Sequence, residues 1–179
     1  MKNSEHRKYS KPGEWNDPDY IQIGYIGNAN NMGIPELTPM PAAMQYAYMS
    51  LWSLMAAPLI YSGDMSKLDE FTINVLCNPE VIEVNQDQLG ECGLVIKKSD
   101  QTFLMVKNLA DGSKAVGLFN RSKTEAEVEV NWAELQISGN KTVRDLWRQN
   151  DIGKFNEKFN TNIPAQGVVM VKIGKGKKK

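Results

Sequence analysis

The hydrophobic pattern divides the chain into a helical first half and a strand-rich second half. Between Met44 and Met55, apolar residues recur at i, i+3, i+4 and i+7, which predicts one face of an amphipathic helix. Pro58 ends this pattern, and the apolar run 59–61 predicts a buried strand that stops at Gly63. Because a stripe of Met and aromatic side chains at helical spacing is typical of a core, we interpret the helix face as a packing surface.

Short β-rich runs separated by turn residues begin at Gly93. Asp111–Gly112 lies between two apolar runs, and Asp-Gly in this position is a hairpin signal. Several short strands with turns between them predict an antiparallel β-sandwich. The expected strands cover residues 102–106, 115–120, 128–132, 142–147 and 168–173.

A polar segment connects the two halves. Ser66, three residues before Asp69, resembles a capping box that opens a helix, and Asn78–Pro79 predicts the end of that helix. Cys77 falls on the apolar face of the helix, so we interpret it as a small buried hydrophobic residue. The polar residues 85–87 are expected to tie the first half to the second through hydrogen bonds.

Charge and residue usage exclude several classes of function. Lys plus Arg and Asp plus Glu each total 21, so the chain has no excess charge that favours nucleic acid or an anionic membrane. His6 is the single histidine and is expected to be solvated, so His-based triads and two-His zinc sites are unavailable. We therefore predict no metal and no cofactor. Cys77 and Cys92 cannot form a disulfide framework, although one bridge between them stays open.

The stretch 37–63 contains no charged residue, which is also true of many transmembrane segments. It contains Pro39, Pro41 and Pro58, however, and it lacks the flanking Lys and Arg asymmetry of a membrane span. A buried helix that leads into a buried parallel strand explains the same composition. We therefore expect no membrane partner.

The segment Trp15-Asn16-Asp17-Pro18-Asp19 carries the candidate chemistry. On an extended segment, Asp17 and Asp19 project to the same face, about 6–7 Å apart, beside Trp15. Carboxylates that bind hydroxyl groups and an aromatic plate for the apolar face of a sugar are typical of a carbohydrate site. Asp and Pro are also turn residues for local reasons, so an ordinary turn fits the same segment.

This segment and its continuation Tyr20-Ile21-Gln22-Ile23-Gly24 resemble a signature of glycoside hydrolase family 27, the α-galactosidase and α-N-acetylgalactosaminidase group. Four further stretches resemble the family in the same order: 49–65, 81–90, 115–121 and 143–147. The resemblance runs from about residue 13 to residue 173.

The resemblance implies an α/β plus all-β fold. The last two β/α units of a TIM-type (β/α)8 barrel occupy residues 13–89, and a C-terminal antiparallel β-sandwich occupies residues 93–174. Residues 1–12 form a polar N-terminal stretch that we interpret as disordered or as a linker, and residues 175–179 form a basic tail.

The resemblance also implies a function: a retaining glycosidase that cleaves terminal α-galactosyl-type residues from oligosaccharides. In the family, the nucleophile and the acid/base lie on earlier strands of the barrel, and no stretch here resembles either. We therefore assign no catalytic residue and predict that the chain alone is inactive. Its expected partners are a galactoside-type oligosaccharide and the missing N-terminal barrel portion. A secreted, periplasmic or lysosomal location is expected for the full-length family, and the sequence itself does not indicate one.

The resemblance implies roles for five side chains. Asp19 and Tyr20 match positions that line the sugar subsite, although Tyr20 stands where the family often has Met. Asp19 accepts hydroxyl hydrogen bonds there and influences the pKa of the neighbouring acid. Trp15 and Asp17 brace the subsite, while Asp64, at the end of the predicted strand, either supports it or caps the adjoining segment. The loop 28–36 is either a rim that shapes substrate entry or a neutral insertion.

A second hypothesis is a non-catalytic carbohydrate-binding or structural β-sandwich module with a barrel remnant. Trp132 and Trp147 could serve as sugar plates if they were exposed, but in a small sandwich we expect them in the core. Asn120 and Asn140 each begin a glycosylation sequon, which has meaning only in a secretory eukaryotic host.

Overall fold

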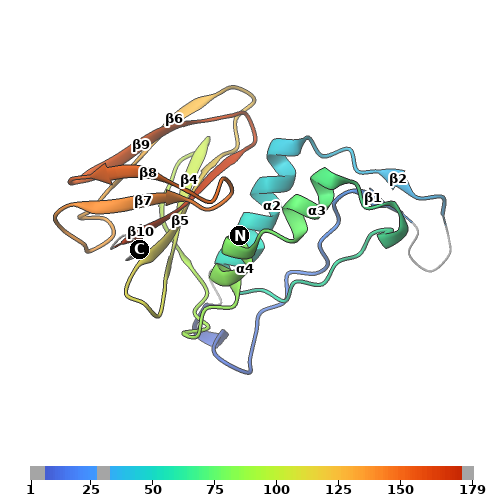
Figure 1. Ribbon diagram of the computed structural model, residues 1–179, viewed down its shortest axis with the longest axis horizontal. Coiled ribbons are helices and arrows are strands. Elements are labelled where there is room, and N and C mark those ends of the chain that lie inside the picture. The colour runs from blue at the N-terminus through green and yellow to red at the C-terminus, as the bar shows by residue number, and fades with distance from the viewer. Residues whose placement is uncertain (1–6, 28–32, 175–179) are drawn as a thin grey trace.

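The computed structural model describes residues 7–27 and 33–174, in which a β-sandwich packs against a helical part (Figure 1). The helical part contains η1 (Arg7–Tyr9), β1 (Tyr25–Ile26), β2 (Glu36–Leu37), α2 (Ala42–Leu54), η3 (Met65–Lys67), α3 (Glu70–Leu76) and α4 (Pro79–Asn85). The sandwich contains β3 (Leu94–Lys98), β4 (Thr102–Asn108), β5 (Lys114–Asn120), β6 (Ala126–Asn131), β7 (Lys141–Asp145), β8 (Asn150–Phe155), β9 (Lys158–Ile163) and β10 (Val168–Gly174).

The sandwich consists of a six-stranded antiparallel sheet and a two-stranded sheet. The strand order of the larger sheet is β3-β4-β5-β10-β7-β8, so β10 pairs with both β5 and β7. Strands β6 and β9 pair with each other and cover one face of this sheet. The core between the sheets is formed by Leu104, Val116, Leu118, Val128, Val130, Trp132, Leu135, Val143, Phe159, Ile163, Val171 and Ile173.

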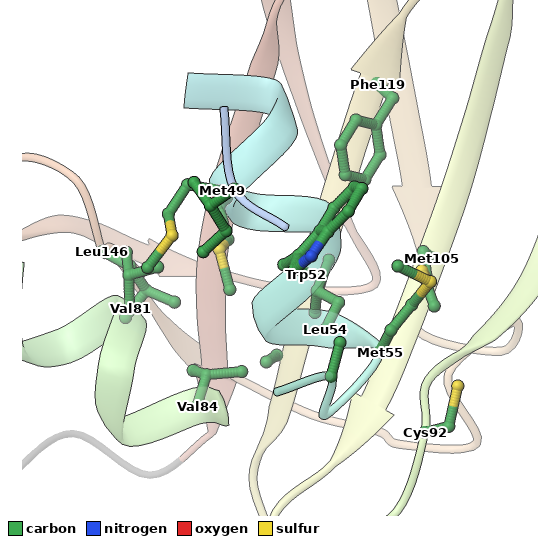
Figure 2. Close-up of a cluster of buried hydrophobic side chains, with 14 of the residues drawn as sticks. Met49, Trp52, Leu54, Met55, Val81, Val84, Cys92, Met105, Phe119 and Leu146 are labelled. Carbon is green, nitrogen blue, oxygen red and sulfur yellow. The ribbon is translucent and has the colours of Figure 1, made fainter. Parts of the chain in front are cut away.

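The opposite face of the six-stranded sheet is equally apolar and is covered by the helical part. Residues of β5 alternate between the two faces: Val116 and Leu118 join the core under β6–β9, whereas Ala115 and Phe119 join the core under α2. Figure 2 shows α2 between α4 and the strands, with Trp52 beside Phe119. One hydrophobic core therefore joins the helical part to the sandwich.

Gly117 lets α2 approach the sheet closely. A Cβ at this position would lie 2.6 Å from Leu54 Cδ1 and would also clash with the ring of Phe119. Leu54 is the last residue of α2 and is completely buried. The position of the helix end on the sheet therefore depends on the missing side chain of residue 117.

Polar contacts hold α4 to the sandwich at both ends, and we call this set the α4 clamp: Asn78, Glu80, Lys107 and Arg144. At the N-terminus, the guanidinium of Arg144 donates to both carboxylate oxygens of Glu80, with Nη2 to Oε1 at 2.6 Å. The Asn78 side chain accepts from the first backbone amides of α4 and donates to the carbonyl oxygens of Leu146 and Trp147.

At the C-terminus of α4, the ammonium of Lys107 donates to the carbonyl oxygens of Val84, at 2.6 Å, and Asn85, at 3.3 Å. Lys107 lies on β4 and is 1% exposed. A cation here complements the partial negative charge of the helix end. Burial nevertheless lowers the pKa of Lys107 to about 8, against the opposing effect of the Asp87 carboxylate.

The predicted link between the halves is confirmed. The Asp87 carboxylate accepts from the Ala110 amide at 3.0 Å, and the Asn85 carbonyl accepts from the Lys107 ammonium, whereas the Asn85 side chain bonds to Ala57 within the helical part. Trp132 is buried, as expected, while Trp147 is only partly buried at the edge of the core. No helix among the described residues is both long and apolar enough to cross a membrane.

Several local predictions are wrong. Asp69, not Ser66, is the N-cap of α3, because its carboxylate accepts from the Thr72 amide. The preceding helix does end just before Asn78–Pro79, as expected, but the sequence analysis missed that Asn78 also opens α4: its side-chain oxygen caps the first turn, and Pro79 fills a position that needs no amide donor. Cys77 is exposed, because α3 ends at residue 76 and the next residue leaves the apolar face.

The polar N-terminal stretch is ordered over its described part. Residues 7–9 form a short 3-10 helix, Arg7 pairs with Glu91 at 3.8 Å, and Ser10 donates to the Gly90 carbonyl at 3.4 Å. Both cysteines are free thiols. His6 and residues 28–32 of the candidate rim loop lie outside the described residues.

The first sequon is not accessible in the folded chain. Asn120 is 2% exposed, and its side-chain nitrogen donates to the carbonyl oxygens of Thr124, Ile163 and Pro164. Its side-chain oxygen accepts from the amide and hydroxyl of Ser122. Asn140, in the second sequon, is exposed.

We expect Gly117→Ala to lower the free energy of unfolding by about 1–3 kcal/mol, because the added methyl overpacks the contact with Leu54. Urea unfolding of Gly117→Ala, Leu54→Ala and the double variant measures the coupling. Since Leu54→Ala removes one of the two groups that clash, the double variant should lose less stability than the two single losses combined. Strict additivity would show that the contact with Leu54 does not contribute to the loss.

Stability should rise with pH across the titration of Lys107. Its pKa is about 8 in the folded chain and 10.5 ordinarily, so the unfolded state binds more protons between these values. The free energy of unfolding of the wild type, relative to Lys107→Met, should therefore increase by up to about 3 kcal/mol from pH 8 to pH 10.5. Denaturation at several pH values tests this; a flat or falling difference contradicts it.

Candidate functional site

The segment from Asp17 to Tyr20 is a turn, so the prediction that Asp17 and Asp19 share one face of an extended strand is wrong. The Asp17 carboxylate accepts from the Asp19 amide at 2.8 Å, and the Asp19 carboxylate accepts from the Tyr20 amide at 2.8 Å. Asp19 has a φ of 92°, a backbone conformation that side chains other than glycine rarely adopt. The hydrogen bonds that the Asp17 and Asp19 carboxylates accept, together with the fixed φ of Pro18, decide this geometry.

Two aromatic side chains of α2 hold the turn in place. The indole of Trp52 donates to the Asp19 carbonyl at 3.1 Å, and the hydroxyl of Tyr48 donates to the Tyr20 carbonyl at 2.8 Å. The two rings pack against each other one helical turn apart, with centroids separated by 4.1 Å. Because strained backbone persists only when its surroundings fix it, we infer that Trp52 and Tyr48 maintain the conformation of Asp19.

This arrangement presents two side chains to solvent at the end of the helical part. Asp19 and Tyr20 are exposed, and Tyr20 retains 49% of its accessible surface. Burial, and next the Asp19 carboxylate, raises the pKa of Tyr48, so its hydroxyl stays protonated as a donor. The sequence predicted that Tyr48 and Trp52 lie on a packing face, and it missed their hydrogen bonds to the turn. A buried tyrosine hydroxyl or indole N–H usually has a hydrogen-bond partner, and this could have indicated the role.

Trp15 lies apart from the acidic pair. It is 46% exposed and lies against Gly90, where an added Cβ would be 2.8 Å from its ring. It borders a cavity of about 300 Å³ together with residues 56–58 and 85–87. Within the described residues, no hydrogen bond or ring contact joins Trp15 to Asp19.

Asp64 acts as a helix cap. Its carboxylate accepts from the Ser66 amide at 2.9 Å and from the Ser66 hydroxyl at 2.6 Å, at the start of η3. These hydrogen bonds lower the pKa of Asp64. Of the two roles that the sequence left open, the contacts favour the cap.

The parallel arrangement that the barrel remnant implies is visible next to this site. Ile21 forms a parallel bridge with Tyr61, and its amide donates to the Ile60 carbonyl at 2.7 Å. The Tyr61 hydroxyl donates to the Ile23 carbonyl at 3.2 Å. Among residues 7–27 and 33–174, no cluster of His, Cys, Asp and Glu could hold a metal ion.

Family models match both parts of the chain. Residues 2–87 match the model described as "Alpha galactosidase A", and residues 99–173 match "Alpha galactosidase C-terminal beta sandwich domain". The chain belongs to the α-galactosidase family, glycoside hydrolase family 27. It corresponds to a C-terminal β-sandwich preceded by a remnant of the barrel, as the resemblance implied.

Two curated family members illustrate the extent of the match. The chain is 32% identical over 171 residues to a probable α-galactosidase of Dictyostelium discoideum, covering 92% of this chain and 41% of that protein. It is 34% identical over 147 residues to α-galactosidase 2 of Arabidopsis thaliana, covering 81% of this chain and 34% of that protein. The chain thus spans well under half the length of these family members.

Solved structures of the α-galactosidase family match the fold. α-Galactosidase I of Mortierella vinacea has a TM-score of 0.85 at 25% identity, over 97% of this chain and 43% of that chain. A variant of a GH27 β-L-arabinopyranosidase from Geobacillus stearothermophilus, solved with arabinose, has a TM-score of 0.84 at 26% identity. That match covers 92% of this chain and 38% of the other.

We expect Tyr48→Phe to loosen the turn, because it removes only the hydroxyl that donates to the Tyr20 carbonyl. The loss in unfolding free energy should be about 0.5–1.5 kcal/mol. Hydrogen exchange at the Ile21 amide should accelerate, since this amide pairs with Ile60 directly after the turn.

The matched control is Tyr25→Phe, whose hydroxyl has no hydrogen-bond partner within the described residues. It should leave both measurements unchanged. Equal effects of the two substitutions would mean that the Tyr48 hydroxyl does not hold the turn.

Proposed function

We propose that this chain is the C-terminal portion of a retaining glycoside hydrolase that removes terminal α-galactosyl-type residues from oligosaccharides. Family membership carries this proposal, together with the names of the Dictyostelium and Arabidopsis relatives. In the proposal, the nucleophile and the acid/base come from a part of the barrel outside this chain. No residue of the chain is assigned a catalytic role, and the chain alone is inactive.

An exposed apolar surface on the helical part supports the need for further barrel strands. Ile34, Ile60 and Met65 retain 83%, 43% and 75% of their accessible surface. Among the described residues, one parallel bridge joins the segments around Ile21 and Tyr61, so they form a short sheet that further barrel strands can extend. In the proposal, residues 13–89 contribute the last two β/α units, and neighbouring units cover this surface.

Asp19 and Tyr20 are proposed to contact the terminal sugar. An ionised carboxylate accepts hydrogen bonds from sugar hydroxyls, and a tyrosine ring packs against the apolar face of the ring while its hydroxyl donates. Asp17 supports Asp19 through the 2.8 Å hydrogen bond to its amide. Trp15 and Asp64 are proposed to support the subsite without touching the sugar: Trp15 packs on Gly90, and Asp64 caps η3.

Retaining hydrolysis requires two carboxylates about 5–5.5 Å apart, one to attack the anomeric carbon and one to protonate the leaving oxygen and then activate water. Asp17 and Asp19 are not proposed for these two roles, because the positions that they match in the family lie on a barrel strand beyond the acid/base. The arabinose complex of the Geobacillus relative supports a carbohydrate as the ligand class.

The purified chain should not hydrolyse an aryl α-galactoside above the uncatalysed rate. A chimera that joins the preceding part of the Dictyostelium relative to this chain should be active once its cooperative unfolding has been verified. Turnover by the chain alone, proportional to its concentration through purification, would falsify the proposal.

In that chimera, Asp19→Asn should lower kcat/KM by about 10–100-fold, because a charged acceptor to the sugar is lost. Asp100→Asn is the matched control, since Asp100 is an exposed carboxylate in the turn between β3 and β4. Equal activity of the two variants would remove Asp19 from the subsite.

A further inference from the structure

A cavity lies between the N-terminal part of α2 and the strands β7 to β10. Its volume is about 800 Å³, which falls within the range of small-molecule sites. Ala43 and Tyr46 of α2 form one wall, while the turn after β7 and the adjoining strands form the others. The turn from Asp17 to Tyr20 is held by other residues of the same helix, Tyr48 and Trp52.

A fixed aromatic side chain lines this cleft. The indole of Trp147 donates to the Ser50 hydroxyl at 2.9 Å, and the ring of Tyr46 meets it edge-on, with centroids 4.7 Å apart at 71°. Val168 and Met170 extend the apolar lining. Because Trp147 is partly exposed and already immobilised, a ligand that packs on it loses little further side-chain entropy.

Neutral polar side chains surround this apolar lining. Asn150 and Asn162 are exposed, and their side-chain amides have no hydrogen-bond partner within the described residues. Each amide offers both donors and an acceptor, which matches hydroxyl groups that themselves donate and accept.

The charged groups of the cleft are already paired. Arg148 donates to the Asp145 carboxylate at 2.7 Å, and Asp151 accepts from Arg144 at 3.0 Å. A charged ligand would have to compete with these pairs, whereas a neutral one would not. An aromatic plate with a neutral polar rim therefore favours an uncharged polyhydroxylated ligand over an anion.

We propose that this cleft binds a neutral saccharide, with one sugar ring against Trp147 and its hydroxyls on Asn150 and Asn162. The site needs no catalytic group, so it goes beyond the hydrolysis proposed above and stands independently of it. It gives the sandwich a sugar-binding role of its own.

The four tryptophans allow a direct test on the full chain. Their indole N–H resonances report on different places: Trp52 at the candidate turn, Trp15 beside Gly90, Trp132 in the core, and Trp147 in the cleft. Titration with galactose, mannose and melibiose is followed by two-dimensional nitrogen–proton NMR. We expect a saturable shift of the Trp147 resonance with a Kd in the millimolar range.

The double variant Asn150→Ala/Asn162→Ala should weaken that Kd by at least about fivefold, because two hydrogen bonds to the sugar are lost. Asn140→Ala, which removes an exposed amide outside the cleft, should leave it unchanged. An unshifted Trp132 resonance verifies that each variant is folded.

Three results would overturn the proposal. The first is the absence of a Trp147 shift with all three sugars, and the second is a shift confined to Trp15 and Trp52. The third is a Trp147 shift that follows protein concentration instead of sugar, since the cleft would then contact a second copy of the chain.

Discussion

The six-stranded sheet has two apolar faces, and within residues 7–27 and 33–174 a second sheet covers only one of them; the rest of the structure depends on this constraint. Strands β6 and β9 cover the first face. The second face presents Phe103, Met105 and Phe119, which would meet water without α2 and α4. Two parts with different secondary structure are therefore obliged to share one core. The α4 clamp fixes the orientation of α4 on the sheet, because Arg144 binds its N-terminal end and Lys107 binds its C-terminal end.

The shared core also determines where the candidate site lies. Met49 and Leu54 anchor α2 on the sandwich side, while Tyr48 and Trp52 hold the turn that carries Asp19. The same helix presents Tyr46 to the cleft beside Trp147. Helix α2 therefore contributes to both candidate sugar-binding surfaces. Because α2 packs on the sandwich, the sandwich also helps to position the acidic turn.

The sequence predicted the features that arise from strong local periodicity. The helix around Met49 and the strands around Leu104, Leu118 and Val171 were expected, because their apolar residues repeat with a clear period. Strands β3, β8 and β9 were missed, since most of their residues are exposed or only partly buried and fewer than half of them are apolar.

Details that depend on a single contact were beyond the sequence. Ser66 and Asp69 are both residues that commonly cap helices. Only the geometry shows that Asp64 caps η3 and that Asp69 caps α3. An aromatic stripe predicts that Trp52 is buried but cannot say that its indole reaches the Asp19 carbonyl. The turn itself was one of two open alternatives at Asp17, and its hydrogen bond to the Asp19 amide decides between them.

The central position of β10 has a consequence for the order of folding. This strand is the last described one in the chain, yet it lies between β5 and β7. During synthesis, the sheet cannot close until β10 has emerged, so the surface that receives α2 stays incomplete. The N-terminal turn with Asp19 therefore reaches its final setting only after the C-terminal strand has been inserted. Such non-local pairing slows folding and leaves the apolar face of α2 exposed until the sheet is complete.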